Sequence, residues 1–119
     1  MKAIGFLFLC SIFIFCESKS VLDEQNETKI RVVNNSVHEL ESVSLFSVRF
    51  NNLAPGDTTA YQVLDFDESK DDPMLYCMVD INNLSLFLEI PKNGRNYTYS
   101  IDSLDLVSKR IYFERFIDN

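Results

Sequence analysis

The alternation of apolar and polar residues is strongest between Met74 and Ile90. Apolar residues occupy every second position on both sides of an Asn pair: Leu75, Cys77, Val79 and Ile81 before it, and Leu84, Leu86, Leu88 and Ile90 after it. Because alternate side chains of a strand point to the same face, this pattern predicts two strands that share one apolar face. A two-residue loop at Asn82-Asn83 would pair Ile81 with Leu84 and Val79 with Leu86. We therefore predict a β-hairpin whose apolar face is covered by a second sheet.

The same alternation, interrupted by turn residues, predicts five further strands. They are expected at about 28–33, 41–46 with a bulge near Phe46-Ser47 that continues the strand to Phe50, 58–64, 96–102 and 109–116. The residues predicted to face inward are Ile30, Val32, Val43, Leu45, Tyr61, Val63, Tyr97, Tyr99, Ile101, Ile111 and Phe113. Seven short strands at this spacing are typical of an all-β, antiparallel β-sandwich of immunoglobulin-like or transthyretin-like type. The topology stays open, because the Cys-Trp-Cys pattern of true immunoglobulin domains is missing.

The N-terminus carries an apolar run, Ile4–Phe15, after Met1-Lys2. The run is too short to span a bilayer and is typical of the helix of a secretory signal. It ends at Cys16, and an apolar run ending at a Cys resembles the lipobox of bacterial lipoproteins, in which this Cys carries the lipid. Phe15 stands where the lipobox pattern has a small residue. We predict a signal peptide at 1–16, a polar tether at 17–27 and a single domain at 28–119.

Two other fates of the N-terminus remain open. Ordinary signal cleavage after Ser18 or Ser20, where small residues precede the cut, would release a freely secreted protein. An uncleaved anchor is the third possibility.

Composition and charge exclude some classes of function. With 46% hydrophobic residues the chain is too apolar to be disordered. The formal net charge of −7 argues against nucleic acid, whose phosphates need a basic patch, and against electrostatic binding to anionic lipid.

Few residues suggest catalytic chemistry. The acidic stretch Asp65–Asp72 has alternating oxygen ligands like a calcium loop, but Lys70 and Tyr76 stand where that loop needs Gly and Glu. We predict a solvated loop there and leave weak cation binding open. Cys77 is expected to pack as a small apolar residue, and His38, the only histidine, to lie in a polar turn. We predict no catalytic residue, cofactor site or metal site.

Four aromatic residues on predicted outward positions are the best functional lead: Tyr76, Phe87, Tyr112 and Phe116. Scattered surface aromatics are common, so a recognition patch is one reading and simple scatter is the other. The partner surfaces that the pattern suggests are a sheet edge and the face that carries Tyr76 and Phe87.

Several stretches together resemble the small, uncharacterised cell-envelope lipoproteins of Gram-negative bacteria that carry one immunoglobulin- or transthyretin-like sandwich. These stretches are the lipobox-like end at Cys16, then 30–36, 50–61, the hairpin and 94–99. The resemblance implies lipid attachment at Cys16 and a location in the bacterial envelope, at the outer membrane or its periplasmic face, and it assigns no activity. We expect a non-catalytic binding or accessory module, with a freely secreted effector or inhibitor as the alternative. Partner and oligomeric state stay open.

Overall fold

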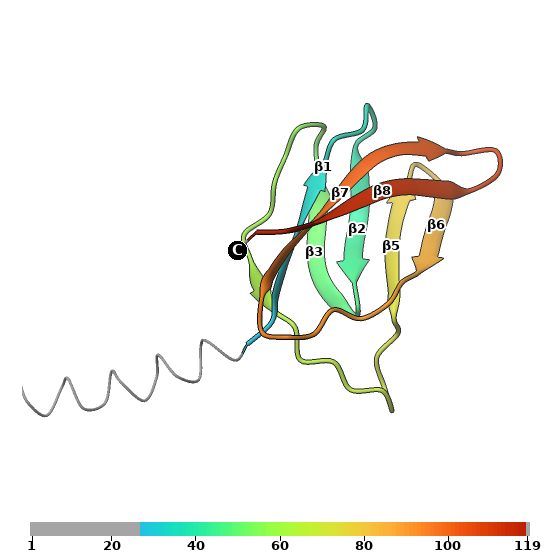
Figure 1. Cartoon of the computed structure of the whole chain (residues 1–119). Helices are drawn as coiled ribbons and strands as arrows, with labels where there is room; N and C mark the ends of the chain where they lie inside the picture. Colours follow the sequence, from blue (N-terminus) through green and yellow to red (C-terminus); the bar gives the residue numbers. More distant parts are fainter. Residues whose placement is uncertain (1–26, 119) are drawn as a thin grey trace, which may run out of the picture.

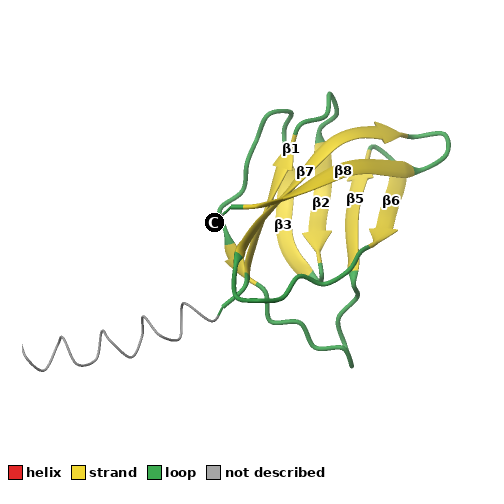
Figure 2. Ribbon diagram, viewed as in Figure 1, coloured by secondary structure: helices red, strands yellow, loops and turns green. Residues whose placement is uncertain are grey.

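The computed structural model describes residues 27–118, which form two four-stranded sheets with the core between them (Figure 1). The first sheet has the order β4-β1-β7-β8, and the second has the order β3-β2-β5-β6. The strands are β1 (Lys29–Asn34), β2 (Leu40–Leu45), β3 (Val48–Leu53), β4 (Gln62–Val63), β5 (Met74–Val79), β6 (Asn82–Phe87), β7 (Asn96–Asp105) and β8 (Arg110–Ile117). Everything between them is loop or turn (Figure 2). The prediction of an all-β, sandwich-like fold is confirmed.

The core forms where the apolar faces of the two sheets meet. Most of the residues predicted to face inward are buried: Ile30, Val32, Val43, Leu45, Leu75, Cys77, Val79, Leu84, Tyr97, Tyr99, Ile101 and Ile111. Two aromatic rings link the sheets: Phe46, in the turn between β2 and β3, meets Tyr99 of β7 edge to face at 5.9 Å between ring centroids. Burial of apolar area at roughly 25 cal/mol per Å² is what holds two such sheets together.

The predicted hairpin exists, but its turn lies two residues earlier than expected. The loop is Asp80-Ile81, and the register pairs Cys77 with Leu84 and Leu75 with Leu86. Ile81 is therefore 89% exposed at the tip instead of lying opposite Leu84, and Asn82 begins β6. Asp80 accepts a positive φ of 56°, a conformation that Asp tolerates better than a β-branched residue.

The expected bulge near Phe46-Ser47 is wrong, because these two residues form a turn. Their φ angles of 53° and 68° are those of a tight hairpin between β2 and β3. Phe46 is nevertheless buried in the core, so this turn residue fits the apolar alternation expected of a strand. The described part of the chain consequently has eight strands, where seven were predicted.

Two further expectations are corrected in the first sheet. Of the strand predicted at 58–64, only the two residues of β4 and one isolated bridge between Val33 and Thr58 form. Val63 is exposed instead of facing inward. The sheet is mixed instead of antiparallel, since β1 runs parallel to β7 with Ile30 beside Tyr97.

The predicted signal peptide 1–16 with its lipid-carrying Cys16, and all but the last residue of the tether 17–27, lie outside the described residues. Within 27–118 the chain has no helix with the length and apolarity needed to cross a membrane.

Candidate functional site

A row of polar side chains crosses all four strands on the outer face of the second sheet. The register places Arg49 of β3 opposite Ser44 of β2, Ser44 opposite Tyr76 of β5, and Tyr76 opposite Ser85 of β6. Residues opposite each other in antiparallel strands point to the same face. The sequence neighbours Leu45 and Leu75 are fully buried, so the row itself faces outward.

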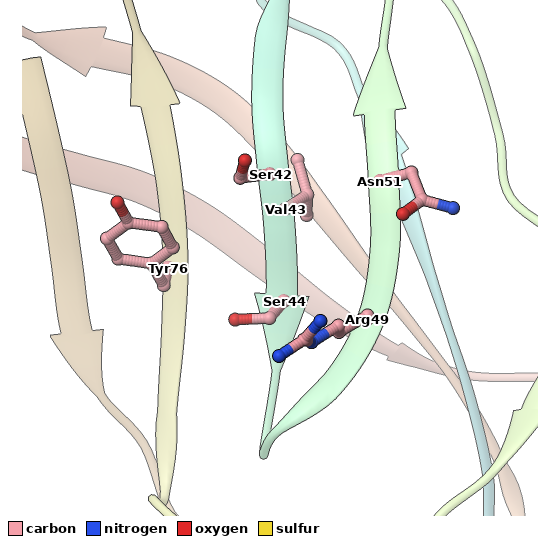
Figure 3. Close-up of a pocket in the computed structure, with 6 residues that line it drawn as sticks. All are labelled: Ser42, Val43, Ser44, Arg49, Asn51 and Tyr76. Atoms are coloured by element: carbon pink, nitrogen blue, oxygen red, sulfur yellow. The ribbon is translucent and has the colours of Figure 1, made fainter. Parts of the chain in front are cut away.

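The middle of this row is hollowed into a depression of about 380 Å³, which we call the outer-face depression (Figure 3). Its lining residues are Ser42, Val43, Ser44, Arg49, Asn51 and Tyr76. The small serine side chains of β2 lie between two long ones, because Arg49 reaches across from β3 and Tyr76 stands on β5 (Figure 3). The shape thus follows from side-chain size along one cross-strand row.

Two bulges of the backbone shape the rim of the depression. The pairing of β2 with β3 shifts on either side of Val43, and the left-handed residues there are Ser42, with φ 51°, and Asn51, with φ 66°. The backbone N–H of Ser42 donates to Oδ1 of Asn52 at 3.0 Å instead of to a strand carbonyl. Bulges bend a strand and re-aim side chains, and positive φ at residues other than Gly is uncommon outside such sites.

The Tyr76 side chain forms one wall of the depression and is held in place by a hydrogen bond. Its hydroxyl donates to Oδ1 of Asn83 on β6 at 2.9 Å. The depression therefore offers the guanidinium of Arg49, two serine hydroxyls and the amide of Asn51 beside the face of an aromatic ring. Such a set can form hydrogen bonds and stack against a ligand, which is chemistry of binding.

The four predicted surface aromatics do not form one patch. Phe87 lies opposite Met74 on the same outer face as Tyr76 and is 73% exposed. Tyr112 follows the buried Ile111 and so points to the outer face of the other sheet, together with Phe116, which lies opposite Thr98. The face with Tyr76 and Phe87 therefore exists as predicted, and the other two aromatics are separate from it.

Strand β8 is a candidate for the predicted binding of a partner at a sheet edge. Within residues 27–118 this strand pairs with β7 alone and ends the first sheet, and it is four times as long as the opposite edge, β4. Tyr112, Phe116 and Ile117 of β8 are each about half exposed. An edge of this kind can accept another strand.

The remaining candidate residues take structural roles. Cys77 is fully buried, and burial raises the pKa of its thiol to about 11, so it packs as a small apolar residue as predicted. His38 is half-buried in the turn before β2, and its carbonyl accepts from the side-chain amide of Asn34 at 2.8 Å.

The acidic stretch 65–72 is a loop, as predicted. Asp67 organises it: its Oδ1 accepts from the Ser69 backbone N–H and hydroxyl, and these hydrogen bonds lower the pKa of Asp67. Phe66 anchors the loop against Phe46 in the core. No cluster of three or more His, Cys, Asp or Glu residues able to hold a metal ion occurs within 27–118.

The sequence pattern indicated Tyr76 but missed the other lining residues of the depression. Ser42, Ser44, Arg49 and Asn51 are polar residues on outward positions, and such residues normally face solvent without any further role. Only the left-handed bulges set them apart, and a bulge leaves no clear mark in a single sequence. Comparison of the chain with protein-family models and with curated proteins finds no match.

Proposed function

We propose that this protein is a non-catalytic, lipid-anchored binding module of the bacterial cell envelope, and that it binds its partner on the outer face of the β3-β2-β5-β6 sheet. The observation that supports this most is the outer-face depression, in which a hydrogen-bonded Tyr76 and Arg49 flank the small serines of a bulged strand. Phe87 extends the same face toward the sheet edge with an exposed ring.

The chemistry of the face defines the kind of partner. Arg49 supplies a planar cation and the serines and Asn51 supply neutral donors and acceptors, so the partner presents hydrogen-bond acceptors or a carboxylate here. The aromatic rings of Tyr76 and Phe87 supply apolar area beside these groups, as interface anchors do. A protein segment with both polar and apolar groups fits this description.

The anchor and the location rest on the sequence. Cys16 at the end of the apolar run is the proposed site of lipid attachment, and the immunoglobulin- or transthyretin-like classification belongs to the same proposal. Two or more acyl chains give stable attachment to a membrane, and the polar stretch after Cys16 lets the domain stand clear of the surface. The alternative, a freely secreted effector or inhibitor, follows if cleavage occurs after Ser18 or Ser20.

Photo-crosslinking in cells tests the binding face. A benzophenone amino acid replaces Tyr76 in one full-length variant and Tyr112, on the other sheet, in a matched control. We expect a discrete crosslinked species from position 76 that disappears when Arg49→Glu is added, and none from position 112. Crosslinking from position 112 alone would move the binding surface to β8 and overturn the proposed face.

Intact mass of the mature protein tests the anchor. We expect a chain that begins at Cys16 and carries an added lipid mass, and the loss of that addition in Cys16→Ser. Cys10→Ser is the control and keeps the lipid. A plain N-terminus at Lys19 or Val21 would establish the secreted alternative instead.

A further inference from the structure

A second hollow opens at the seam between the two sheets. Its inner part, of about 180 Å³, is lined by Leu88, Glu89, Tyr99, Phe113 and Arg115. Its outer part, of about 470 Å³, is lined by Glu89, Ile90, Pro91, Lys92, Asn93, Tyr97 and Arg115. Both parts share Glu89 and Arg115, so we treat them as one seam pocket. Here the segment that follows β6, with Leu88 and Glu89, lines the same hollow as Tyr99 of β7 and Arg115 of β8.

Tyr99 lines the inner part of the seam pocket. The residue is only 1% exposed, and its hydroxyl oxygen has no hydrogen-bond partner among the described residues. Its ring is fixed between Phe46, edge to face, and Phe113, stacked at 6.2 Å. A buried hydroxyl without a partner is unfavourable, and nearly all such groups in proteins are satisfied. The hydroxyl therefore needs an acceptor that the surrounding side chains do not supply.

The protonation state of Tyr99 makes it a donor. Burial raises the pKa of Tyr99 to about 12, although the guanidinium of Arg115, as a nearby hydrogen-bond donor and positive charge, lowers it by a smaller amount. The phenol is consequently neutral under physiological conditions and offers its proton.

Opposite charges flank this donor. Arg115 lies directly opposite Tyr99 in the β7–β8 register, with its guanidinium carbon 5.2 Å from the ring centroid of Tyr97. Tyr97 is held in turn by a 2.9 Å hydrogen bond from its hydroxyl to the carbonyl of Lys92. Glu89 brings a carboxylate to the same space, and Leu88 and Phe113 bring apolar surface.

We propose that the seam pocket binds a small zwitterion with an apolar side chain, the chemistry of a free aliphatic α-amino acid. The ligand carboxylate accepts hydrogen bonds from Tyr99 and Arg115, and its ammonium group pairs with Glu89. Its side chain packs against Leu88 and Phe113. One such ligand satisfies the hydroxyl of Tyr99 and pairs with both Glu89 and Arg115, which a purely anionic or purely cationic ligand does not. The site is independent of the outer-face depression.

Titration of the ¹⁵N-labelled full-length protein in an uncharged detergent tests the proposal, with L-leucine as the probe. We expect saturable shifts of backbone amides around Glu89, Tyr99 and Arg115, and none around Tyr76. Two fragments of the probe provide the comparison: 4-methylpentanoate lacks the ammonium group, and L-leucinamide lacks the carboxylate. Each should bind at least about tenfold more weakly, since each loses one charge-assisted contact.

Variants separate the pocket from nonspecific binding. Tyr99→Phe keeps the packed ring and removes only the hydroxyl, so we expect leucine affinity to fall by at least about tenfold. Tyr112→Phe makes the same chemical change on an exposed residue and should leave affinity unchanged. Arg115 is exposed, so Arg115→Gln provides a second measurement of leucine affinity if Tyr99→Phe does not fold. Absence of saturable shifts at the seam, equal binding of leucine and 4-methylpentanoate, or full affinity in Tyr99→Phe or Arg115→Gln would each overturn the proposal.

Discussion

At the scale of single residues, Asn34 shows how a buried polar group can hold a turn together. Its side chain is fully buried at the end of β1, and its amide donates to the carbonyls of His38, at 2.8 Å, and Leu53, at 3.0 Å. Its Oδ1 accepts from the backbone N–H and the hydroxyl of Ser36. One amide thereby joins the turn before β2 to the end of β3.

Removing this amide should destabilise the whole domain. Asn34→Ala removes the donor to the carbonyls of His38 and Leu53 and the acceptor for Ser36, and it opens a small cavity, so we expect the free energy of unfolding to fall by about 2–4 kcal/mol. Urea denaturation measures the change. Asn35→Ala is the matched control, because that neighbouring side chain is exposed, and it should change stability by less than about 0.5 kcal/mol. Equal effects of the two substitutions would contradict the assigned role.

Asp118 fastens the end of the described chain to the outer face of the first sheet. Its carboxylate accepts from the hydroxyls of Thr98 and Tyr61, and Nε of Arg31 donates to Thr98 Oγ1 at 2.9 Å. The guanidinium of Arg31 also lies over the ring of Tyr61, 4.5 Å from its centroid. Partial burial would raise the pKa of Asp118, but the hydrogen bonds from Thr98 and Tyr61 and the charge of Arg31 outweigh it and lower the pKa.

The lowered pKa makes a small part of the stability depend on pH. An unfolded Asp takes up its proton near pH 3.8, whereas folded Asp118 does so at lower pH. The stabilisation is therefore complete at neutral pH and is lost as pH falls below about 4. We expect Asp118→Asn to be less stable than the parent at pH 7, by under about 1 kcal/mol because solvent screens the group, and we expect this difference to shrink as the pH falls below about 4. Urea midpoints at pH 7 and below pH 4 measure this, and a difference that does not shrink at low pH would contradict the assigned role of the carboxylate.

At the scale of the elements, the two-residue period predicted which side of most strands is buried. It could not locate the turn of the β5–β6 hairpin, because moving a two-residue loop by two positions keeps every side chain on the same face. Apart from Ile81, which the Asp80-Ile81 turn leaves exposed, the two turn positions satisfy the apolar pattern equally well. The choice between them depends on local backbone geometry, where Asp80 accepts the positive φ and Ile81 is left outside.

Substitution of Ile81 distinguishes the two registers. At the exposed tip, Ile81→Lys should change the free energy of unfolding by less than about 0.5 kcal/mol. Opposite Leu84 in the core, the same change would bury a charge. Val79→Lys has the same parity but a buried position, and we expect it to cost at least about 3 kcal/mol or to prevent folding. Guanidinium denaturation compares the two variants, and a large loss in Ile81→Lys would restore the Asn82-Asn83 turn.

The outer-face depression could not be predicted from the sequence, for a related reason. Alternation predicted that Ser44 and Tyr76 face away from the core, as they do. It did not predict the bulges at Ser42 and Asn51, since an extra residue in one strand is visible only against the strand beside it. The strand predicted through Phe46 was wrong for a similar reason, because a buried aromatic residue in a turn cannot be told from an inward-facing strand residue in the sequence.

At the scale of the whole molecule, the order of strands was the least predictable feature. The sheet that holds Tyr99 depends on the parallel pairing of β1 with β7, between segments about 67 residues apart. Apolar burial is not directional, so a pattern of inward residues is compatible with many strand orders. Hydrogen bonds at the ends, such as that from the Lys29 N–H to the carbonyl of Arg95, appear only once the chain has folded.

The exposed edge of β8 and the acidic charge of the molecule act in opposite directions, and their balance predicts how the protein associates. Tyr112, Phe116 and Ile117 leave apolar area along an unpaired edge, which favours pairing with a second copy. The net charge of −7 opposes this through repulsion that salt screens, with a Debye length of about 10 Å at 0.1 M and 3 Å at 1 M.

We therefore expect the lipid-free Cys16→Ser chain to be monomeric at low salt and to self-associate increasingly toward 1 M salt, as measured by sedimentation velocity. Phe116→Lys adds a charge on the edge strand and should abolish the salt effect. Val107→Lys removes an even more exposed apolar side chain, but at the tip of the β7–β8 turn, where no strand can pair, and should leave the salt effect in place. If both variants suppressed association equally, general apolar exposure and not the β8 edge would be its cause.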